Sequence, residues 1–321
     1  MPYVEAAGVK LYFEEHGQGY PIIFIHEFVS DARQWNDQVR YFSRGYRCIA
    51  YNARGYPPSD VPEEPALYGW EFAVDDIDAV MQGLEIERAH LIGSSMGGYA
   101  ALQFGLRYPD KVGAIVAAAI GSGSPPSQRD AWSRETSVLA QAFLARGMAA
   151  MAEKIARGPT RIQLKYKDPK IWRGFIEQLR QHSSRGMSQT MARCQALRPS
   201  LHDLCDQFSE VAAPVLLVVG DEDVPCLETS LMLKAVLPNA GLWICPNSGH
   251  AINLEEPAAF NAQVESFLAA VERGSWRRGY STVANGIRLE TVGDNHRANS
   301  SIHVTQERAE PDVTPLHHQS S

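Results

Sequence analysis

Residues 89–106 constrain the fold of this chain more than any other segment. An apolar run that is typical of a buried strand stops at Gly93-Ser-Ser-Met-Gly97, and a helical pattern follows at once. A G-x-S-x-G motif between a strand and a helix is the pattern of a nucleophile elbow, a strained turn that exposes a serine hydroxyl. Gly93 and Gly97 flank the serine because side chains there would clash where strand and helix cross. The segment predicts that Ser95 is a nucleophile; an ordinary glycine-rich turn is the alternative.

Apolar runs alternate with amphipathic helical patterns along most of the chain. This alternation predicts an α/β fold with a mostly parallel, doubly wound sheet that is covered on both faces. The expected strands span residues 22–26, 47–51, 89–93, 112–120, 215–220 and 241–245, after an N-terminal hairpin of residues 3–6 and 9–15. Between the second and third of these strands, the helical spacing of residues 73–81 predicts that Asp75, Asp76 and Asp78 form a solvated helix face.

The alternation breaks after residue 120. Residues 121–206 show helical patterns over 131–157, 169–181 and 185–196, without a convincing strand. We therefore expect a helical cap at 121–206, inserted into a core formed by residues 1–120 and 207–272. Residues 273–321 are mostly polar with scattered prolines, and they predict a disordered C-terminal tail.

The expected cap contains two sets of side chains that could contact a substrate: apolar residues suited to lining a pocket, and a group of basic residues. The pocket candidates are Trp132, Phe143, Met148 and Trp172. The basic residues are interpreted as a solvated surface, with binding of a substrate carboxylate or a coenzyme phosphate as the alternative. They are Arg146, Arg157, Arg161, Lys165 and Lys167.

Two later segments supply the partners that a serine nucleophile needs. A serine hydroxyl is a weak nucleophile until a base removes its proton, and the base needs an orienting acid. The expected strand at 215–220 ends in Asp221-Glu-Asp223, and the strand at 241–245 precedes a loop that ends in His250. The chain order serine, acid, histidine is the order that accompanies a nucleophile elbow.

These segments together resemble the α/β-hydrolase superfamily over residues 3–272. The stretch Asn52-Ala-Arg-Gly-Tyr-Pro-Pro-Ser59-Asp60 is similar to the family's D-x-R-G-x-G-x-S loop, with Asn52 in place of the usual Asp. The branch that the chain resembles contains non-haem perhydrolases, enol-lactonases and small esterases. The resemblance implies an α/β-hydrolase fold with an inserted cap.

The resemblance also implies roles for single residues. Ser95 matches the nucleophile and His250 the base. The acid matches Asp223, three residues after Gly220, and Asp221 is the near alternative. The backbone N–H groups of Phe28 and Met96 match the oxyanion hole, whose loss of one donor typically costs about 2.7–4 kcal/mol of barrier.

The loop that carries Phe28 departs from the family at one position. Glu27 stands where glycine is usual, after His26, which we expect to brace the loop. One interpretation is that the Glu27 carboxylate points to solvent or pairs with a nearby cation. The other is that it lines the pocket mouth and disfavours anionic substrates.

The triad pattern predicts a serine hydrolase that cleaves a carboxylic ester or lactone through an acyl-enzyme on Ser95, without a cofactor. One alternative is a hydrolase of C–C bonds in diketones that uses the same triad. Another is a non-enzymatic ligand receptor on the same fold, because fold does not imply function. The expected partner is a small-molecule substrate with an apolar part; the sequence does not indicate an oligomeric state.

The composition of the chain limits the partners, the cysteine chemistry and the cellular location that we expect. The net charge of −7 and the lack of a dominant basic cluster argue against nucleic acid as a partner. The five cysteines are far apart and form no C-x-x-C pair, so neither a metal site nor a disulfide framework is expected. The N-terminus lacks a signal pattern, and the apolar runs are too short to span a bilayer. These features predict a cytoplasmic protein that is not inserted in a membrane.

Overall fold

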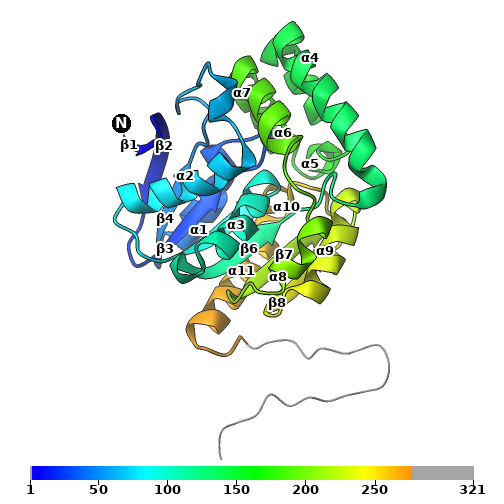
Figure 1. Ribbon diagram of the computed structural model, residues 1–321. Coiled ribbons are helices and arrows are strands. Elements are labelled where there is room, and N and C mark those ends of the chain that lie inside the picture. The colour runs from blue at the N-terminus through cyan, green and yellow to red at the C-terminus, as the bar shows by residue number, and fades with distance from the viewer. Residues whose placement is uncertain (1, 277–321) are drawn as a thin grey trace, which may run out of the picture. The chain divides into compact units, whose positions relative to one another are not determined.

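The computed structural model describes residues 2–276, which contain one eight-stranded sheet flanked by helices (Figure 1). The strand order is β1-β2-β4-β3-β5-β6-β7-β8. Strand β2 is antiparallel to β1 and β4, and the other neighbouring strands are parallel. The strands are β1 (Tyr3–Ala6), β2 (Val9–His16), β3 (Tyr20–Ile25), β4 (Tyr46–Tyr51), β5 (Ala89–Ser94), β6 (Val112–Ala118), β7 (Val215–Gly220) and β8 (Ala240–Cys245). The predicted mostly parallel sheet is confirmed.

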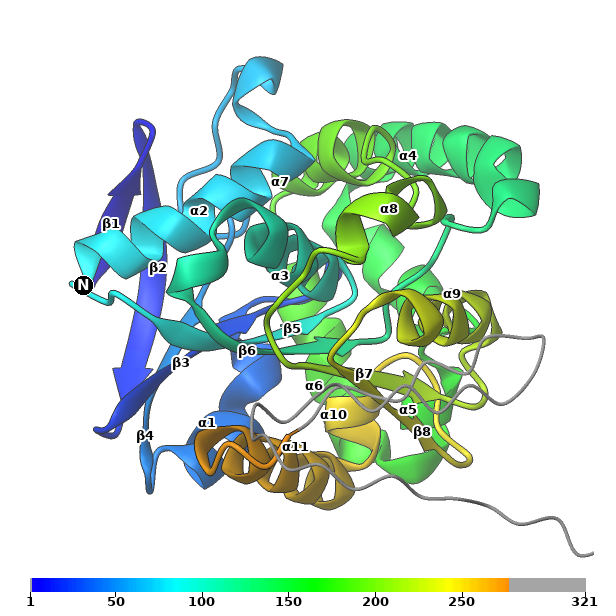
Figure 2. The same cartoon turned by 60° about the horizontal axis from the view of Figure 1, so that its bottom comes forward.

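Helices cover both faces of the sheet (Figure 2). On one face, α2 (Trp70–Gly83), α3 (Met96–Arg107) and α9 (Val224–Val236) bury side chains such as Val74, Leu102 and Leu233. On the other face, α1 (Asn36–Phe42) and α11 (Pro257–Glu272) bury Phe42 and Phe260. The central strands are buried on both faces, as their nearly continuous apolar sequences require. The remaining helices outside the expected cap are α8 (Cys205–Phe208), α10 (Ile252–Glu255) and the 3₁₀ turns Ala32–Trp35, Pro65–Leu67 and Pro109–Lys111. Two further 3₁₀ turns, Pro126–Gln128 and His202–Leu204, lie near the two ends of the segment expected to form the cap.

The helices of the expected cap lie between β6 and β7. They are α4 (Arg129–Ala156), α5 (Ile162–Lys167), α6 (Pro169–Arg180), α7 (Ser184–Gln189) and the π-helix Thr190–Gln195. The expected helix at 131–157 is interrupted at Gly147, which has a φ of 74° that only glycine adopts readily. The expected strand at 112–120 ends at Ala118, because Ala119 turns the chain with a φ of 51°.

The C-terminal boundary of the described chain lies against the core. Helix α11 ends at Glu272, and Trp276 packs its ring on Phe267 and donates a hydrogen bond to the carbonyl oxygen of Asn239 over 2.9 Å. The sequence predicts a disordered tail from residue 273, but residues 273–276 are described and Trp276 is packed, so the expected start is wrong. The rest of the predicted tail, residues 277–321, lies outside the described residues. Among residues 2–276, the helices are too short or too polar to cross a bilayer.

The expected solvated face of α2 is wrong for two of its three aspartates. Asp76 and Asp78 are buried, and Asp76 accepts hydrogen bonds from Arg54 Nε over 2.8 Å and from Nη2 over 2.5 Å. Asp78 pairs with Lys111, and only Asp75 is well exposed. The helical spacing of residues 73–81 could not indicate that Arg54, 22 residues before Asp76, pairs with this face of the helix. The carboxylates of Asp76 and Asp78 therefore hold neighbouring elements together through ion pairs.

The junction between β3, β5 and α3 leaves no room for side chains. A Cβ atom on Gly97 would collide with the carbonyl oxygen of Ile25, and one on Gly93 would collide with that of Gly97. The sheet and α3 therefore approach at backbone distance directly beneath Ser95. This contact explains the spacing of the two glycines in the motif.

Replacing Gly97 with Ala should lower the free energy of unfolding by about 1–3 kcal/mol or more, because backbone atoms must move to admit the methyl group. Urea unfolding measures the change. The matched control is Gly174→Ala in α6, where an added Cβ meets nothing within 4 Å. That substitution should be neutral or stabilising by roughly 0.5–1 kcal/mol. Equal stability of both variants would contradict the packing described for Gly97.

Candidate active site

Ser95 stands at the apex of the turn between β5 and α3. Its backbone has φ 50° and ψ −109°, a strained conformation that costs about 1–3 kcal/mol for a residue other than glycine. The backbone N–H of Ser95 donates to the carbonyl oxygen of Ala118 over 2.7 Å, which ties the turn to β6. Ser95 is partly accessible although its neighbours in the motif are buried. The local structure is that of the predicted elbow.

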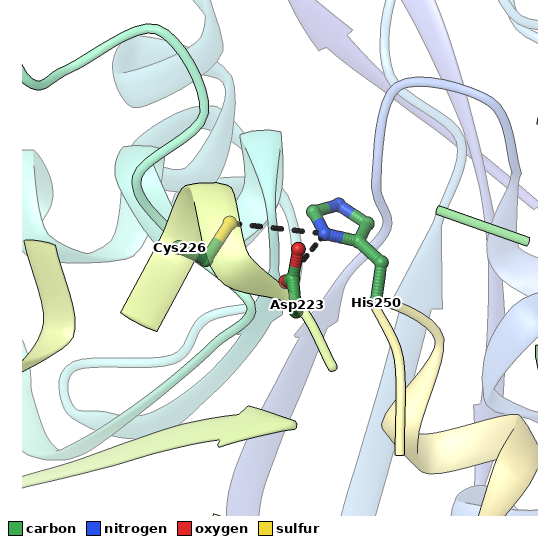
Figure 3. A group of neighbouring side chains, drawn as sticks. All are labelled: Asp223, Cys226 and His250. Carbon is green, nitrogen blue, oxygen red and sulfur yellow. Dashed lines mark hydrogen bonds and ion pairs between the residues drawn. The ribbon is translucent and has the colours of Figure 1, made fainter. Parts of the chain in front are cut away.

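His250 and Asp223 form a hydrogen-bonded pair at the ends of β8 and β7. His250 Nδ1 lies 2.7 Å from Asp223 Oδ2, and both side chains are buried (Figure 3). Burial by itself lowers the pKa of His250, but the charge and hydrogen bond of Asp223 outweigh it and raise the pKa to about 10. Burial alone would raise the pKa of Asp223; its interactions with His250 instead hold that pKa below the usual range. Asp223 therefore stabilises a positive charge on the His250 imidazole.

Asp221, the alternative acid, has a different position. Its Oδ1 accepts a hydrogen bond from the backbone N–H of Ser248 over 3.1 Å. Backbone hydrogen bonds from Asn247 and Ser248 lower the pKa of Asp221. Asp221 thus fastens the loop that carries His250, while Asp223 contacts the imidazole itself.

Cys226 is a second neighbour of the His250 imidazole, as Figure 3 shows. Its Sγ lies 3.8 Å from His250 Nδ1 on the same side as Asp223. Two zinc ligands at about 2.0–2.1 Å from one ion lie roughly 3.3 Å apart in a tetrahedral site. The 2.7 Å between Nδ1 and Oδ2 is instead a hydrogen-bond distance, so the group is arranged to orient an imidazole.

The residues of the two predicted oxyanion donors, Phe28 and Met96, belong to the same apolar cluster. Phe28 and Met96 are buried together with cap residues. Met96 opens α3, where backbone N–H groups have no acceptor within the helix. The carbonyl oxygen of Phe28 accepts a hydrogen bond from Tyr56 Oη over 2.7 Å, which fixes the loop after β3.

His26 braces this loop. The backbone N–H of Ala53 donates to His26 Nε2 over 3.0 Å, so Nδ1 carries the proton and donates to the carbonyl oxygen of Glu27 over 2.7 Å. Burial lowers the pKa of His26 to about 4. The imidazole therefore stays neutral at physiological pH and acts as a fixed hydrogen-bonding strut.

Glu27 does not point to solvent. Its side chain is 2% exposed and pairs with Arg161 of the cap, which is 3% exposed. Glu27 Oε2 also lies 3.9 Å from His250 Nε2. The interpretation of a paired carboxylate is correct, and the expected solvated position of Arg161 is wrong. The pairing also balances the Glu27 charge, which removes the simple reason for repelling anions. The sequence offered no signal that joined two residues 134 positions apart.

The cap residues proposed as a pocket lining separate into two places. Phe143, Met148 and Trp172 belong to the same cluster as Phe28, whose ring centroid lies 5.9 Å from that of Phe143. Trp132 packs instead on Gly123, and its indole N–H donates to the carbonyl oxygen of Gln195 over 3.1 Å. Three of the four pocket candidates therefore lie in one cluster with Phe28, and Trp132 lies apart from them, against Gly123 and Gln195.

A family model described as the alpha/beta hydrolase fold matches residues 20–257, and the chain belongs to this family. The chain is 26% identical to 3-oxoadipate enol-lactonase 2 of Acinetobacter baylyi, over 82% of this chain and 94% of that protein. It is 27% identical to 2-hydroxy-6-oxo-6-phenylhexa-2,4-dienoate hydrolase of Burkholderia cepacia, over 81% and 91%. Among solved structures, the enol-lactonase of Burkholderia xenovorans LB400 superposes with a TM-score of 0.72 at 22% identity, over 84% of this chain and all of that one.

Replacing Asp223 with Asn should lower the pKa of His250 to 6.5 or below, because the neutral amide cannot stabilise an imidazolium and burial disfavours one. The raised pKa means that the pair stabilises the native state fully below pH 6.5 and loses this contribution as the pH rises toward 10. Asp223→Asn should therefore destabilise the protein at pH 6 and much less at pH 10. An NMR titration of the histidine ring and thermal unfolding at both pH values provide the measurements.

Asp221→Asn is the matched control for this experiment, since it removes a carboxylate two residues away that does not contact the imidazole. The pKa of His250 should stay raised in that variant. If the pKa of His250 stays raised in Asp223→Asn and returns to its ordinary value in Asp221→Asn, then Asp221 and not Asp223 is the acid that pairs with His250.

Proposed function

We propose that this protein is a serine hydrolase that cleaves a carboxylic ester or a lactone through an acyl-enzyme on Ser95. The observation that carries the proposal is the buried 2.7 Å hydrogen bond between His250 and Asp223, in a chain whose Ser95 occupies a strained elbow. Membership of the α/β hydrolase family supports it. The similarity to an enol-lactonase over most of both chains supports a lactone or ester as the substrate class.

The proposed reaction assigns one task to each residue. His250 Nε2 takes the proton of Ser95 Oγ while Oγ bonds to the substrate's carbonyl carbon. The N–H groups of Phe28 and Met96 hold the resulting oxyanion. His250 then gives the proton to the departing alcohol oxygen as its bond to the carbon breaks, which leaves an acyl group on Ser95. A water molecule, deprotonated by His250, releases the acid in the same two steps.

Asp223 favours this sequence by stabilising the imidazolium that forms in each step. Its carboxylate also fixes the tautomer, because Nδ1 must carry the hydrogen that it donates to Oδ2. Nε2 is thereby left as the nitrogen that exchanges protons with Ser95 and the leaving group.

The similarity to a dienoate hydrolase favours a second candidate function, hydrolysis of a C–C bond. In that reaction, the same triad would cleave the C–C bond of a diketone instead of a C–O bond. Substrate comparison separates the two: an ester or lactone hydrolase turns over simple esters readily, whereas a dedicated C–C hydrolase turns over a vinylogous diketone far faster.

Ser95→Ala should reduce turnover of p-nitrophenyl acetate, butyrate and octanoate by roughly 10⁴-fold or more, because the acyl-enzyme cannot form. Steady-state rates, followed by burst kinetics, provide the test. The control is Ser94→Ala, which removes a neighbouring hydroxyl that is buried at the end of β5. That variant should retain most activity. Equal rates in wild type and Ser95→Ala would contradict the serine mechanism.

A further inference from the structure

The ion pair between Glu27 and Arg161 joins the cap to the core beside the candidate catalytic histidine. Arg161 Nη2 donates to Glu27 Oε2, and Arg161 Nη1 donates to the carbonyl oxygen of Thr160 over 2.8 Å. The guanidinium carbon lies 5.8 Å from the ring centroid of Phe175. On the core side, the backbone N–H of Glu27 donates to Gln34 Oε1 over 3.0 Å, which fixes the start of the loop. Both charged groups are thus held by their surroundings.

Each partner of this pair keeps one polar atom without a hydrogen bond. Among residues 2–276, neither Glu27 Oε1 nor Arg161 Nε has a hydrogen-bond partner, although both atoms are buried. A buried polar atom that is left unsatisfied costs about 1–3 kcal/mol, and more when the group is charged. Two such atoms in one ion pair require an explanation beyond holding the cap in place.

The two atoms form one complementary set. Oε1 belongs to the same carboxylate as the paired Oε2, and Nε belongs to the same planar guanidinium as the paired Nη2. Each is joined through one carbon to an atom of the ion-pair contact, Oε1 as an acceptor and Nε as a donor. A hydroxyl group, which donates one hydrogen bond and accepts others, can satisfy both atoms at once.

The charge of the pair favours a neutral group. Glu27 and Arg161 balance each other, so a substrate carboxylate placed here would face the Glu27 carboxylate as well as the guanidinium. An ammonium group would face the guanidinium in the same way. A hydroxyl meets neither repulsion.

The pair also lies where the reacting end of a substrate must be. Glu27 Oε2 is 3.9 Å from His250 Nε2, the nitrogen that exchanges protons in the proposed reaction. Phe28, the expected oxyanion donor, is the next residue in the chain. A group bound to Glu27 and Arg161 therefore sits beside the scissile carbonyl.

We propose that Glu27 and Arg161 form a binding subsite for a hydroxyl group close to the scissile carbonyl, so that the preferred substrates are hydroxyacyl esters or hydroxylated lactones. This inference rests on the proposed function for its reaction, but it concerns recognition. Glu27 and Arg161 determine specificity in this account, and they take no part in breaking bonds. It also gives a role to the glutamate that replaces the glycine usual at this position.

The test compares two esters that differ by one hydroxyl, p-nitrophenyl 3-hydroxybutyrate and p-nitrophenyl butyrate. Wild type should show a kcat/KM at least 10-fold higher for the hydroxylated ester, because its hydroxyl bonds to charged groups. Glu27→Gln and Arg161→Gln should each reduce this ratio to about 2 or less. The double variant should show no further loss, since both residues act on the same hydroxyl.

The matched control removes a different link between cap and core. Arg185 pairs with Glu63 in an exposed position away from His250, and Arg185→Gln breaks that pair alone. It should leave the ratio of the two esters unchanged. If Glu27 and Arg161 only fasten the cap, their variants would lower both rates together and wild type would show no preference, which would overturn the proposal.

A binding measurement separates this inference from the proposed function. Calorimetry on Ser95→Ala should give a Kd for methyl 3-hydroxybutyrate at least 10-fold lower than for methyl butyrate. Loss of turnover with every ester, combined with this binding preference, would refute the hydrolase and keep the subsite. Equal Kd values, or equal kcat/KM values in wild type, would refute the subsite. The wild-type ratio and this binding comparison decide the question even if the Glu27 or Arg161 variants fail to fold.

Discussion

The hydrogen bond between His250 and Asp223 is the interaction on which the site depends. Two ionisable side chains are buried together, and burying either one alone would carry a large cost in free energy. The loop after β7 and the loop after β8 must therefore keep their register, which Asp221 secures through Ser248. The parallel pairing of β7 with β8 brings both loops to the same edge of the sheet, near the end of β5 that carries Ser95.

The cap is connected to this edge by charge as well as by apolar contact. Phe143, Met148 and Trp172 pack in one cluster with Phe28, while Arg161 reaches the core carboxylate of Glu27. Apolar contact alone would allow the cap many similar positions, because it is non-directional. The ion pair selects one position and places polar atoms beside the imidazole. In the proposed subsite, recognition of substrate and attachment of the cap would rest on the same two side chains.

Much of the fold, and the pairing of His250 with Asp223, could be predicted from the sequence, because the signals are local. Buried strands appear as continuous apolar runs, and the elbow appears as two glycines around Ser95. The failures involve partners that are distant in the sequence. Asp76 is buried in an ion pair with Arg54, and Arg161 is buried in an ion pair with Glu27. The periodicity of either segment does not indicate that these side chains are buried. The interruption of α4 at Gly147 could not be predicted either, because a single glycine inside a helical pattern is usually tolerated.

The most direct test of the account is the reaction of the protein with a fluorophosphonate, followed by peptide mapping with mass spectrometry. In this reaction, an activated serine oxygen displaces fluoride from phosphorus and stays covalently attached. We expect one adduct, on the peptide that contains Ser95, with labelling that is lost in Ser95→Ala and greatly slowed in Asp223→Asn. Absence of an adduct in wild type, or an adduct on another serine that persists in Ser95→Ala, would contradict it.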